Sequence, residues 1–356
     1  MSGGADEQQD PVQAALLVRV WSEPDTPAVL RARLVDAEGD DAGGTFSTAV
    51  GTAEIGREVL RWLGRIGTGP APVPAAPAAA DVAPLVGAGW LAEHRDDPDL
   101  VTLQVVDGPE PRYLAGAGRL DWDADLHEPG GRGVVGPAGF GRLADRLGIG
   151  AGSHVVLAGG RRPLLAASAY WAFAHRGHPR LSLLDGGLAH WVASGRETAA
   201  EPRERPPAAG YPARATRREL LATRDQLLGG LVGAPPGTAL VDCRTRGEFA
   251  GEPGQAYDRP VDRHRMTGHI PGAVSLPPED LLDDDGLLLD TAHLRQVCDR
   301  LGLRESDQVV VYCGVNDRSA LVWFALAEVL GLPDVRCYHG AWAEYGSLGD
   351  TVAARD

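Results

Sequence analysis

The chain of 356 residues contains 44% hydrophobic and 23% charged residues, a composition that excludes a disordered chain and suits a soluble protein of two or three domains. Its net charge of -15 disfavours binding to the phosphate backbones of nucleic acids, and no apolar run approaches the ~18 residues of a membrane span. All 34 basic residues are arginine, and the absence of lysine excludes Schiff-base chemistry and a Walker-type phosphate loop.

The first 66 residues are predicted to form a small unit of their own. Residues 1–10 are polar and acidic and lack the layout of a secretory signal, so we expect a cytoplasmic protein. Apolar runs around Leu16 and Leu30 predict strands, and apolar residues at helical spacing over residues 55–66 predict a helix. This β-β-α unit has no assigned role. Residues 67–82, rich in proline and alanine, predict an extended linker.

The rest of the chain is predicted to be an internal repeat. A second linker rich in proline and alanine, residues 199–215, separates residues 83–198 from residues 216–356. In each half short apolar runs alternate with helical patterns, which favours a parallel sheet flanked by helices. The fold class is therefore α/β, with two such domains after the N-terminal unit.

The matching positions of the two halves differ in one chemical respect. The spacing from Gly159 to Gly186 is 27 residues, and so is the spacing from Cys313 to Gly340. Open α/β sheets bind ligands beyond the carboxyl ends of their strands, and Cys313 directly follows a predicted strand. Because glycine stands at the matching point of the first half, that half is predicted to lack a nucleophile. The strands predicted in the second half lie near residues 239–242, 273–276, 309–312 and 335–338.

The four cysteines are not arranged as a metal site. They form no C-x-x-C pair and have no neighbouring histidine at ligand spacing, so neither a metal nor a disulfide framework is expected. Cys313 stands between an apolar strand and an amphipathic helix, where loop N–H groups and the helix dipole are expected to lower its pKa and make it nucleophilic. Cys243, Cys298 and Cys337 are predicted to be buried structural thiols.

Several segments together resemble the rhodanese family, in particular its tandem-domain members, which include thiosulfate and 3-mercaptopyruvate sulfurtransferases. In the second half the similar segments are residues 241–249, residues 268–273, the loop after Cys313 and residues 338–342. The first half is similar in residues 90–93, 120–126, 143–148 and 184–191. The resemblance covers roughly residues 83–350 and implies a rhodanese-like domain without a catalytic cysteine, followed by a catalytic one.

This resemblance implies a ping-pong sulfur transfer that needs no cofactor. The Cys313 thiolate would take a sulfane sulfur from a small donor, thiosulfate in preference to 3-mercaptopyruvate. It would then pass the sulfur, held as a persulfide, to a thiol, to cyanide or to a sulfur-carrier protein. A persulfide anion needs hydrogen-bond donors and a water-poor wall, which a loop of backbone N–H groups can supply.

The loop departs from the family pattern Cys-Arg-x-Gly-x-Arg-Ser. Asn316 stands in place of the glycine, and asparagine tolerates a left-handed backbone better than other non-glycine residues. Asp317 is expected to raise the pKa of Cys313 unless Arg318 or solvent screens its charge. The residues predicted to form the anion cradle are Gly314, Val315, Asn316, Asp317, Arg318 and Ser319.

Other residues are predicted to support the site or to bind substrate. Arg318 is expected either to hold an anionic donor or to pair with Glu248. Glu248 stands where mercaptopyruvate enzymes carry a substrate arginine, which puts that donor in doubt, and Arg259 is a candidate substitute. For His269 the family pattern favours a structural role over proton transfer. The full supporting set is Asp242, Arg244, Glu248, Arg259, His269 and Trp342.

Two other functions fit the same residues. A cysteine-based phosphatase or arsenate reductase of the related fold also places a cysteine in an anion cradle, but with five residues between cysteine and arginine. Here only residues 314–317 separate Cys313 from Arg318, and the shorter ring favours a sulfur atom over a tetrahedral oxyanion. A non-enzymatic interaction module is the second alternative, suggested by the N-terminal unit and the altered loop.

Overall fold

The structure is a computed structural model that describes residues 16–23, 26–36, 46–50, 82–128, 133–208, 210–212, 214–252, 265–305, 307–349 and 351–355. The chain divides into two compact units, Met1–Ala79 and Ala80–Asp356. Each unit is considered by itself.

In the first unit the described residues form a three-stranded antiparallel sheet in the order β1-β2-β3. The two predicted strands are present as β1 (Leu16–Glu23) and β2 (Thr26–Asp36). A third strand, β3 (Phe46–Val50), was not predicted, because five residues with a Ser-Thr pair give too short a pattern of alternation. The predicted helix at residues 55–66 lies outside the described residues.

The second unit contains two five-stranded sheets in which every strand pair is parallel. Their strand orders are β4-β9-β8-β5-β7 and β11-β15-β14-β12-β13, which is the same order when the strands are numbered within each half. The strands of the first sheet are β4 (Leu85–Val86), β5 (Leu100–Val106), β7 (Gly118–Asp121), β8 (His154–Gly159) and β9 (Leu181–Leu184). Those of the second are β11 (Leu221–Ala222), β12 (Thr238–Asp242), β13 (Ala273–Ser275), β14 (Gln308–Tyr312) and β15 (Val335–Tyr338).

The four strands predicted in the second half are therefore confirmed, while β11 has only two residues and gives no periodic signal. A short antiparallel pair, β6 (Tyr113–Leu114) with β10 (Thr198–Ala199), accompanies the first sheet. The α-helices are α2 (Ala88–His94), α3 (Trp122–Leu126), α4 (Pro137–Arg146), α5 (Leu165–His175), α6 (Gly187–Ala193), α7 (Arg224–Gln226), α8 (Arg246–Ala250), α9 (Thr291–Leu301), α10 (Ser319–Trp323) and α11 (Ala341–Tyr345). The described residues also form short 3-10 segments, η1 (Arg218–Leu220) and η4 (Pro278–Leu281), and π-helical segments, η2 (Leu227–Leu231) and η5 (Phe324–Val329).

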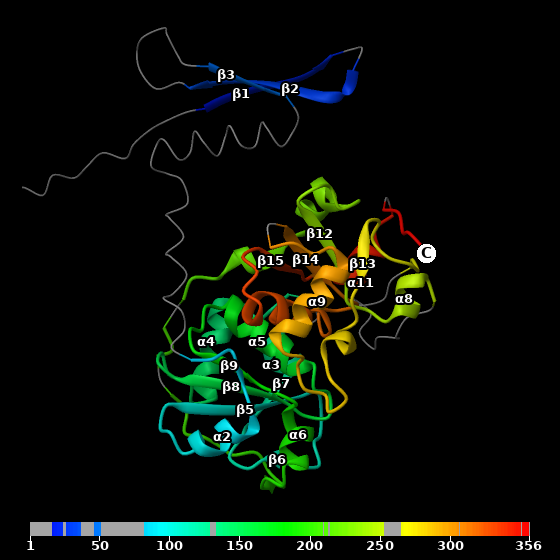
Figure 1. Cartoon of the computed structure of the whole chain (residues 1–356). Helices are drawn as coiled ribbons and strands as arrows, with labels where there is room; N and C mark the ends of the chain where they lie inside the picture. Colours follow the sequence, from blue (N-terminus) through cyan, green and yellow to red (C-terminus); the bar gives the residue numbers. More distant parts are fainter. Residues whose placement is uncertain are drawn as a thin grey trace, which may run out of the picture. The chain divides into compact units, whose positions relative to one another are not determined.

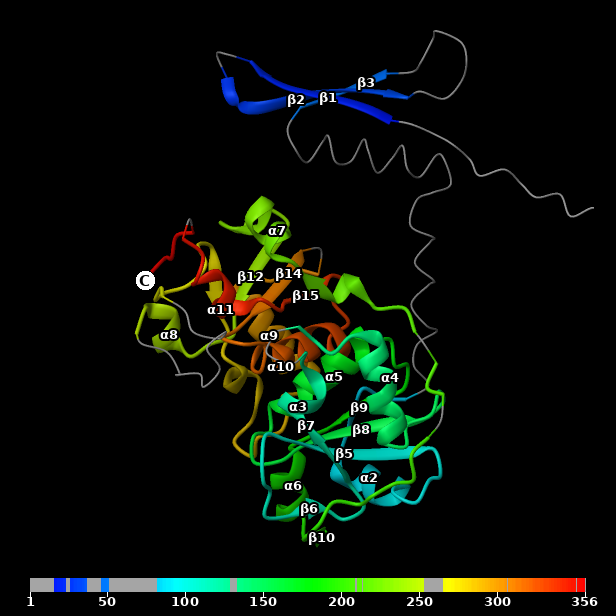
Figure 2. The same ribbon diagram turned by 180° about the vertical axis from the view of Figure 1, so that it is seen from behind.

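Helices of both halves lie between the two parallel sheets (Figures 1 and 2). α5 comes from the first half and α10, with its continuation η5, from the second, and the ring of Tyr170 packs edge-on against Phe324 at 4.9 Å. All 11 residues of α5 are buried. A single apolar core joins the inner faces of both sheets to these helices, so the two halves form one body. Separate cores cover the outer face of each sheet.

The glycine pair after β9 allows two elements of the first half to approach each other closely. Gly186 and Gly187 have φ of 65° and 53°, in the left-handed region that glycine enters without steric cost. A Cβ on Gly187 would lie 2.8 Å from the carbonyl oxygen of Gly159 and 3.1 Å from its nitrogen. The pair therefore lets the start of α6 approach the end of β8 closely.

We predict that Gly187→Ala destabilises the protein by more than the roughly 1–2 kcal/mol that a left-handed alanine costs, because the new methyl group also meets backbone atoms. Gly302→Ala is the matched control, since Gly302 has φ of 70° but an added Cβ would have no neighbour within 4 Å. The measurement is the free energy of unfolding in urea. Equal losses for the two variants would show that the contact with Gly159 contributes nothing.

Candidate active site

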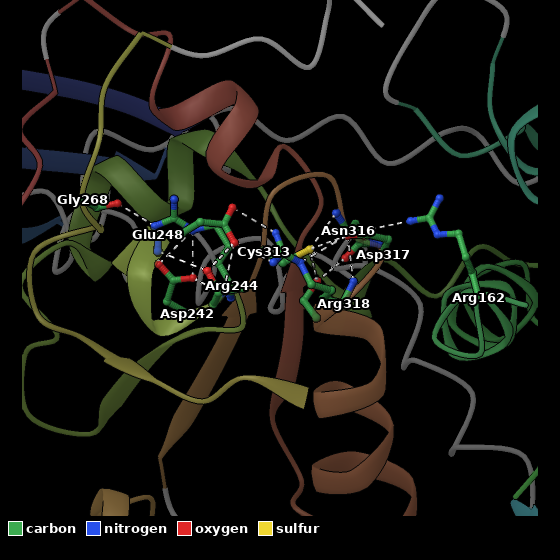
Figure 3. Close-up of polar contacts among 11 residues, drawn as sticks. Arg162, Asp242, Arg244, Glu248, Gly268, Cys313, Asn316, Asp317 and Arg318 are labelled. Atoms are coloured by element: carbon green, nitrogen blue, oxygen red, sulfur yellow. Dashed lines mark hydrogen bonds and ion pairs between the residues drawn. The ribbon is translucent and has the colours of Figure 1, made fainter. Parts of the chain in front are cut away.

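Cys313 is positioned by β14, the strand between β12 and β15. Residues 309–312 of this strand are buried, and the Cys313 side chain is 0% exposed. The backbone N–H of Trp342, at the start of α11, donates to the Cys313 carbonyl oxygen at 2.8 Å and fixes the base of the loop. The chain then runs through residues 314–318 before α10 begins at Ser319, as the sequence predicted (Figure 3).

The sulfur of Cys313 lies in a polar cup formed by its own loop. The backbone N–H of Asn316 donates to Sγ at 3.0 Å, and the hydroxyl of Ser319 lies 3.5 Å from Sγ. That hydroxyl also lies 2.8 Å from the side-chain oxygen of Asn316, so its single proton can serve either acceptor. Asn316 has φ of 68° and therefore adopts the left-handed conformation expected of the residue that replaces glycine.

The pKa of Cys313 differs from the expectation drawn from the sequence. Burial raises the pKa of this thiol, and the neighbouring Asp317 carboxylate raises it further. The charge of Arg318 and the hydroxyl and N–H groups of Ser319 lower it by less. The expected lowering is therefore wrong, because the desolvation of a closed site outweighs the donors of the loop. The thiol donates to Oδ1 of Asp317 at 3.4 Å. This contact explains why Asp317 raises the pKa of Cys313, as the sequence predicted.

Of the two roles considered for Arg318, the structure contains the pair with Glu248. Nη1 of Arg318 donates to Oε2 of Glu248 at 2.6 Å, and Nη2 donates to Oε1 at 3.2 Å (Figure 3). Burial acts to raise the pKa of Glu248, but the bonds and charge of Arg318, with the N–H of Thr245 and the charge of Arg244, lower it to about 2. Glu248 also closes the capping box of α8 with Thr245. The pair thus ties α8 to the loop.

Asp317 forms a second ion pair, with an arginine from the other half that was not predicted. Nη2 of Arg162 donates to Oδ2 of Asp317 at 3.0 Å, while Nη1 donates to Asp107 at 2.7 Å. Arg162 lies on the opposite side of Asp317 from Glu248 in the close-up (Figure 3). It belongs to the loop after β8, which matches the Cys313 loop in the repeat. The repeat could have drawn attention to this loop, but no sequence pattern shows that the two loops touch.

A pocket of about 380 Å³ adjoins this ion pair. Cys313 is buried and does not line it, whereas Asp317, which contacts the thiol, does. Asp317 therefore contacts both the pocket and the sulfur. Both halves contribute to the lining, which consists of Arg161, Arg162, Pro163, Leu164, Leu165, Pro278, Glu279, Leu282, Asp317 and Arg318.

Three of the predicted supporting residues form a buried network beside α11. Nη2 of Arg244 donates to Oδ2 of Asp242 and to the carbonyl oxygen of Gly268, each at 2.6 Å. The guanidinium carbon of Arg244 lies 4.2 Å from the centre of the Trp342 ring. Since both charges are buried and cross-bonded, the network holds the end of β12 and the start of α11 in place.

The remaining predicted residues are His269, two residues of the Cys313 loop and Arg259. His269 stacks on Phe249 at 3.7 Å, and its Nδ1 lies 2.9 Å from the Phe249 carbonyl oxygen, an arrangement that fits a structural role. Gly314 and Val315 are buried in the loop. Arg259 lies outside the described residues.

The matching position of the first half is closed to a side chain. Gly159 ends β8 where Cys313 follows β14, and a Cβ on Gly159 would lie 2.5 Å from both Cα and O of Pro163. The first-half loop therefore folds back onto its own strand end. This packing explains why glycine stands where the second half has cysteine.

Two parallel sheets and a thiol held in a loop of hydrogen-bond donors define an α/β protein with a candidate cysteine site. A model of the rhodanese-like domain matches residues 224–348. The sulfur carrier protein TtuD of Thermus thermophilus is 34% identical over 268 residues, which cover 74% of this chain and 94% of that protein. A candidate thiosulfate sulfurtransferase of Saccharopolyspora erythraea is 36% identical over 268 residues, covering 74% and 93%. The chain therefore belongs to the rhodanese family and is a sulfurtransferase.

Solved structures show the same fold at lower sequence identity. The crystal structure of YnjE superposes with a TM-score of 0.68 at 22% identity, covering 76% of this chain and 68% of that one. A persulfide form of EanB with ergothioneine also gives 0.68, at 18% identity over 76% and 70%. Within the described residues, no helix has both the length and the apolar character needed to cross a membrane.

The low pKa of Glu248 makes a pH-dependent contribution to stability. Because its folded pKa of about 2 lies below the usual 4.5, the contribution is present above ~pH 5 and is lost as the pH falls towards ~pH 2. We predict that Glu248→Gln lowers the free energy of unfolding by about 3 kcal/mol at neutral pH and that the gap to the wild type narrows on acidification. Urea unfolding across this range measures the gap, with exposed Glu279→Gln as the control for charge removal. A gap that is constant with pH would contradict the ion pair.

Removing the charge of Asp317 is expected to release the thiol. Asp317→Asn keeps the size of the side chain but removes the carboxylate that raises the pKa of Cys313. We predict that the pH midpoint for alkylation of Cys313 by iodoacetamide moves downward in this variant. Asp107→Asn is the matched control, because it removes the other partner of Arg162 and leaves Asp317 beside the sulfur. A midpoint that moves equally in both variants would assign the effect to Arg162.

Proposed function

We propose that this sulfurtransferase takes a sulfane sulfur from thiosulfate and carries it as a persulfide on Cys313. The observation that supports this most directly is the setting of the thiol. Its sulfur accepts from the Asn316 N–H at 3.0 Å and lies one side chain away from a pocket lined by Arg161, Arg162 and Arg318. A cup of donors suits a persulfide anion, and arginines suit an anionic donor.

In the proposed first half-reaction the Cys313 thiol, which donates to Oδ1 of Asp317 at 3.4 Å, gives up its proton, and this proton leaves with the sulfite product. The resulting thiolate attacks the outer sulfur of thiosulfate, the S–S bond of the donor breaks, and sulfite leaves with the electron pair. Because burial and Asp317 raise the pKa of Cys313, the thiol form is favoured before the donor binds.

The donor preference rests on the surroundings of Glu248. An arginine at this position would offer a positive charge for the carboxylate of 3-mercaptopyruvate, whereas Glu248 is a carboxylate and binds Arg318 with both oxygens. Thiosulfate carries no carboxylate and does not need that contact, and Arg161 and Arg162 of the first-half loop line the pocket where its charge could bind. This comparison favours thiosulfate over 3-mercaptopyruvate.

The second half-reaction passes the outer sulfur to an acceptor that approaches through the same pocket. A thiol and cyanide are small enough to enter it. The name of the Thermus thermophilus relative, a sulfur carrier protein, supports a protein acceptor as well. An acceptor that approaches the sulfur past Asp317 would also disturb the pair with Arg162.

We further propose that residues 216–356 form the catalytic rhodanese domain and residues 83–198 a rhodanese-like domain without a nucleophile. The phosphatase alternative has less support, because both terminal nitrogens of Arg318 donate to Glu248 instead of facing an oxyanion. The role of residues 1–66 and the cytoplasmic location stay predictions from the sequence.

The proposal predicts one added sulfur atom on the intact protein after exposure to thiosulfate and removal of excess donor. Mass spectrometry should show the addition in the wild type and its loss on treatment with cyanide, because cyanide takes the outer sulfur as thiocyanate. Cys313→Ser should show no addition, while Cys298→Ser, a substitution in helix α9, should behave as the wild type. Sulfur retained on Cys313→Ser, or rapid turnover of an aryl phosphate by the wild type, would refute the proposal.

A further inference from the structure

Three of the four cysteines lie on one face of the second sheet, next to one another. Cys313 follows β14, Cys243 follows the neighbouring strand β12, and Cys337 belongs to β15 on the other side. All three are 0% exposed and belong to the core between the two sheets. The residues that alternate with them, Leu240, Val310, Tyr312 and Tyr338, belong instead to the core on the outer face. The three thiol groups therefore share the inner face.

The strand register places Cys243 opposite Cys313. β12 and β14 pair in parallel, with Val241 opposite Val311 and Asp242 opposite Tyr312. The pairing continues past the strand ends, because the N–H of Cys243 donates to the carbonyl oxygen of Tyr312 at 2.7 Å. Neighbouring strands lie about 4.8 Å apart, within the range of about 4.4–6.8 Å between the Cα atoms of disulfides.

Cys337 does not lie directly opposite Cys313 on the neighbouring strand. Its partner on β14 is Val311, two residues before the active cysteine. The diagonal separation on a sheet is larger than the direct one. Cys337 therefore serves as a matched comparison, being a thiol on the same face in the wrong register.

We propose that Cys243 is a resolving thiol that discharges the Cys313 persulfide when no acceptor is present. The sulfur of Cys243 attacks the inner sulfur of the persulfide, a Cys243–Cys313 disulfide forms, and the persulfide S–S bond breaks. The outer sulfur leaves with the electron pair as hydrosulfide and takes up the proton of Cys243, so hydrogen sulfide is released without an external oxidant. Two equivalents of a small thiol then reduce the disulfide and restore both cysteines.

The environment of Cys243 makes this discharge slow relative to transfer. Burial raises the pKa of Cys243, and the nearby Cys313 and Asp242 raise it further, so the attacking thiolate is scarce. An acceptor in the pocket therefore reacts first. The disulfide route serves as a default that releases the sulfur as sulfide and leaves the active cysteine in a form that reducing thiols can recover. The inference rests on the proposed persulfide.

The test follows the loaded enzyme after the donor has been removed. Wild type, Cys243→Ala and Cys337→Ala are each treated with thiosulfate, desalted and incubated without acceptor, and the persulfide, the released sulfide and the cross-linked peptides are measured over time. We expect the wild type and Cys337→Ala to release one sulfide for each Cys243–Cys313 peptide formed. Cys243→Ala should keep its persulfide at least several-fold longer. Equal decay in all three proteins, or a cross-link from Cys313 to Cys337, would overturn the inference.

A second experiment separates this inference from the proposed function. Reduced protein that has never met a sulfur donor is treated with the thiol oxidant diamide, which links thiols that lie within reach. A Cys243–Cys313 disulfide is expected, and its absence would overturn the inference even if the persulfide forms normally. Absence of any persulfide on the wild type would instead refute the proposed function. Cys243→Ser is the substitute if Cys243→Ala has an altered circular dichroism spectrum.

Discussion

The site depends on the burial of two helices, α5 and α10, between the inner faces of the two sheets. Each sheet has an apolar inner face that must be covered. α5 packs on the first sheet, α10 packs on the second, and the two helices pack on each other within one shared core. This shared core fixes the first-half loop that follows β8 against the second-half loop that follows β14. Without that packing Arg162 would not reach Asp317, and the pocket beside the sulfur would lack one of its walls.

Within that frame the charges of the site are paired across element boundaries. Arg318, adjacent to Asp317 in the chain, pairs with Glu248 on α8, while Asp317 pairs with Arg162 from the other half. Arg162 is the most exposed member of these two pairs, with 44% of its side chain accessible, whereas Asp317 is 5% exposed. The pair that meets solvent is thus the easier one to open. The buried pair with Glu248 keeps the backbone of the loop in place while the outer pair changes.

The parts of the fold that the sequence predicted are those with a strong local signal. The buried strands of the second half, the loop position of Cys313 and the left-handed backbone at Asn316 follow from apolar runs and residue type. The pairing of Arg162 with Asp317 could not be predicted, because it joins loops 155 residues apart through tertiary packing. The direction of the Cys313 pKa shift was mispredicted for the same reason. The loop donors are visible in the sequence, but the completeness of burial is a property of the whole core.

The tight turn at Gly159 limits which amino acids can replace this glycine during evolution. Any side chain there meets the backbone of Pro163, so replacing glycine with cysteine would place a thiol where there is no room for one. A single codon change therefore cannot give the first half a working nucleophile, and the loop from Gly160 to Leu164 would have to be rebuilt as well. Meanwhile that loop supplies Arg162 to the neighbouring site. Steric contact at Gly159 therefore keeps the nucleophile in the second half only. If Cys313 were lost, the first half could not supply a replacement.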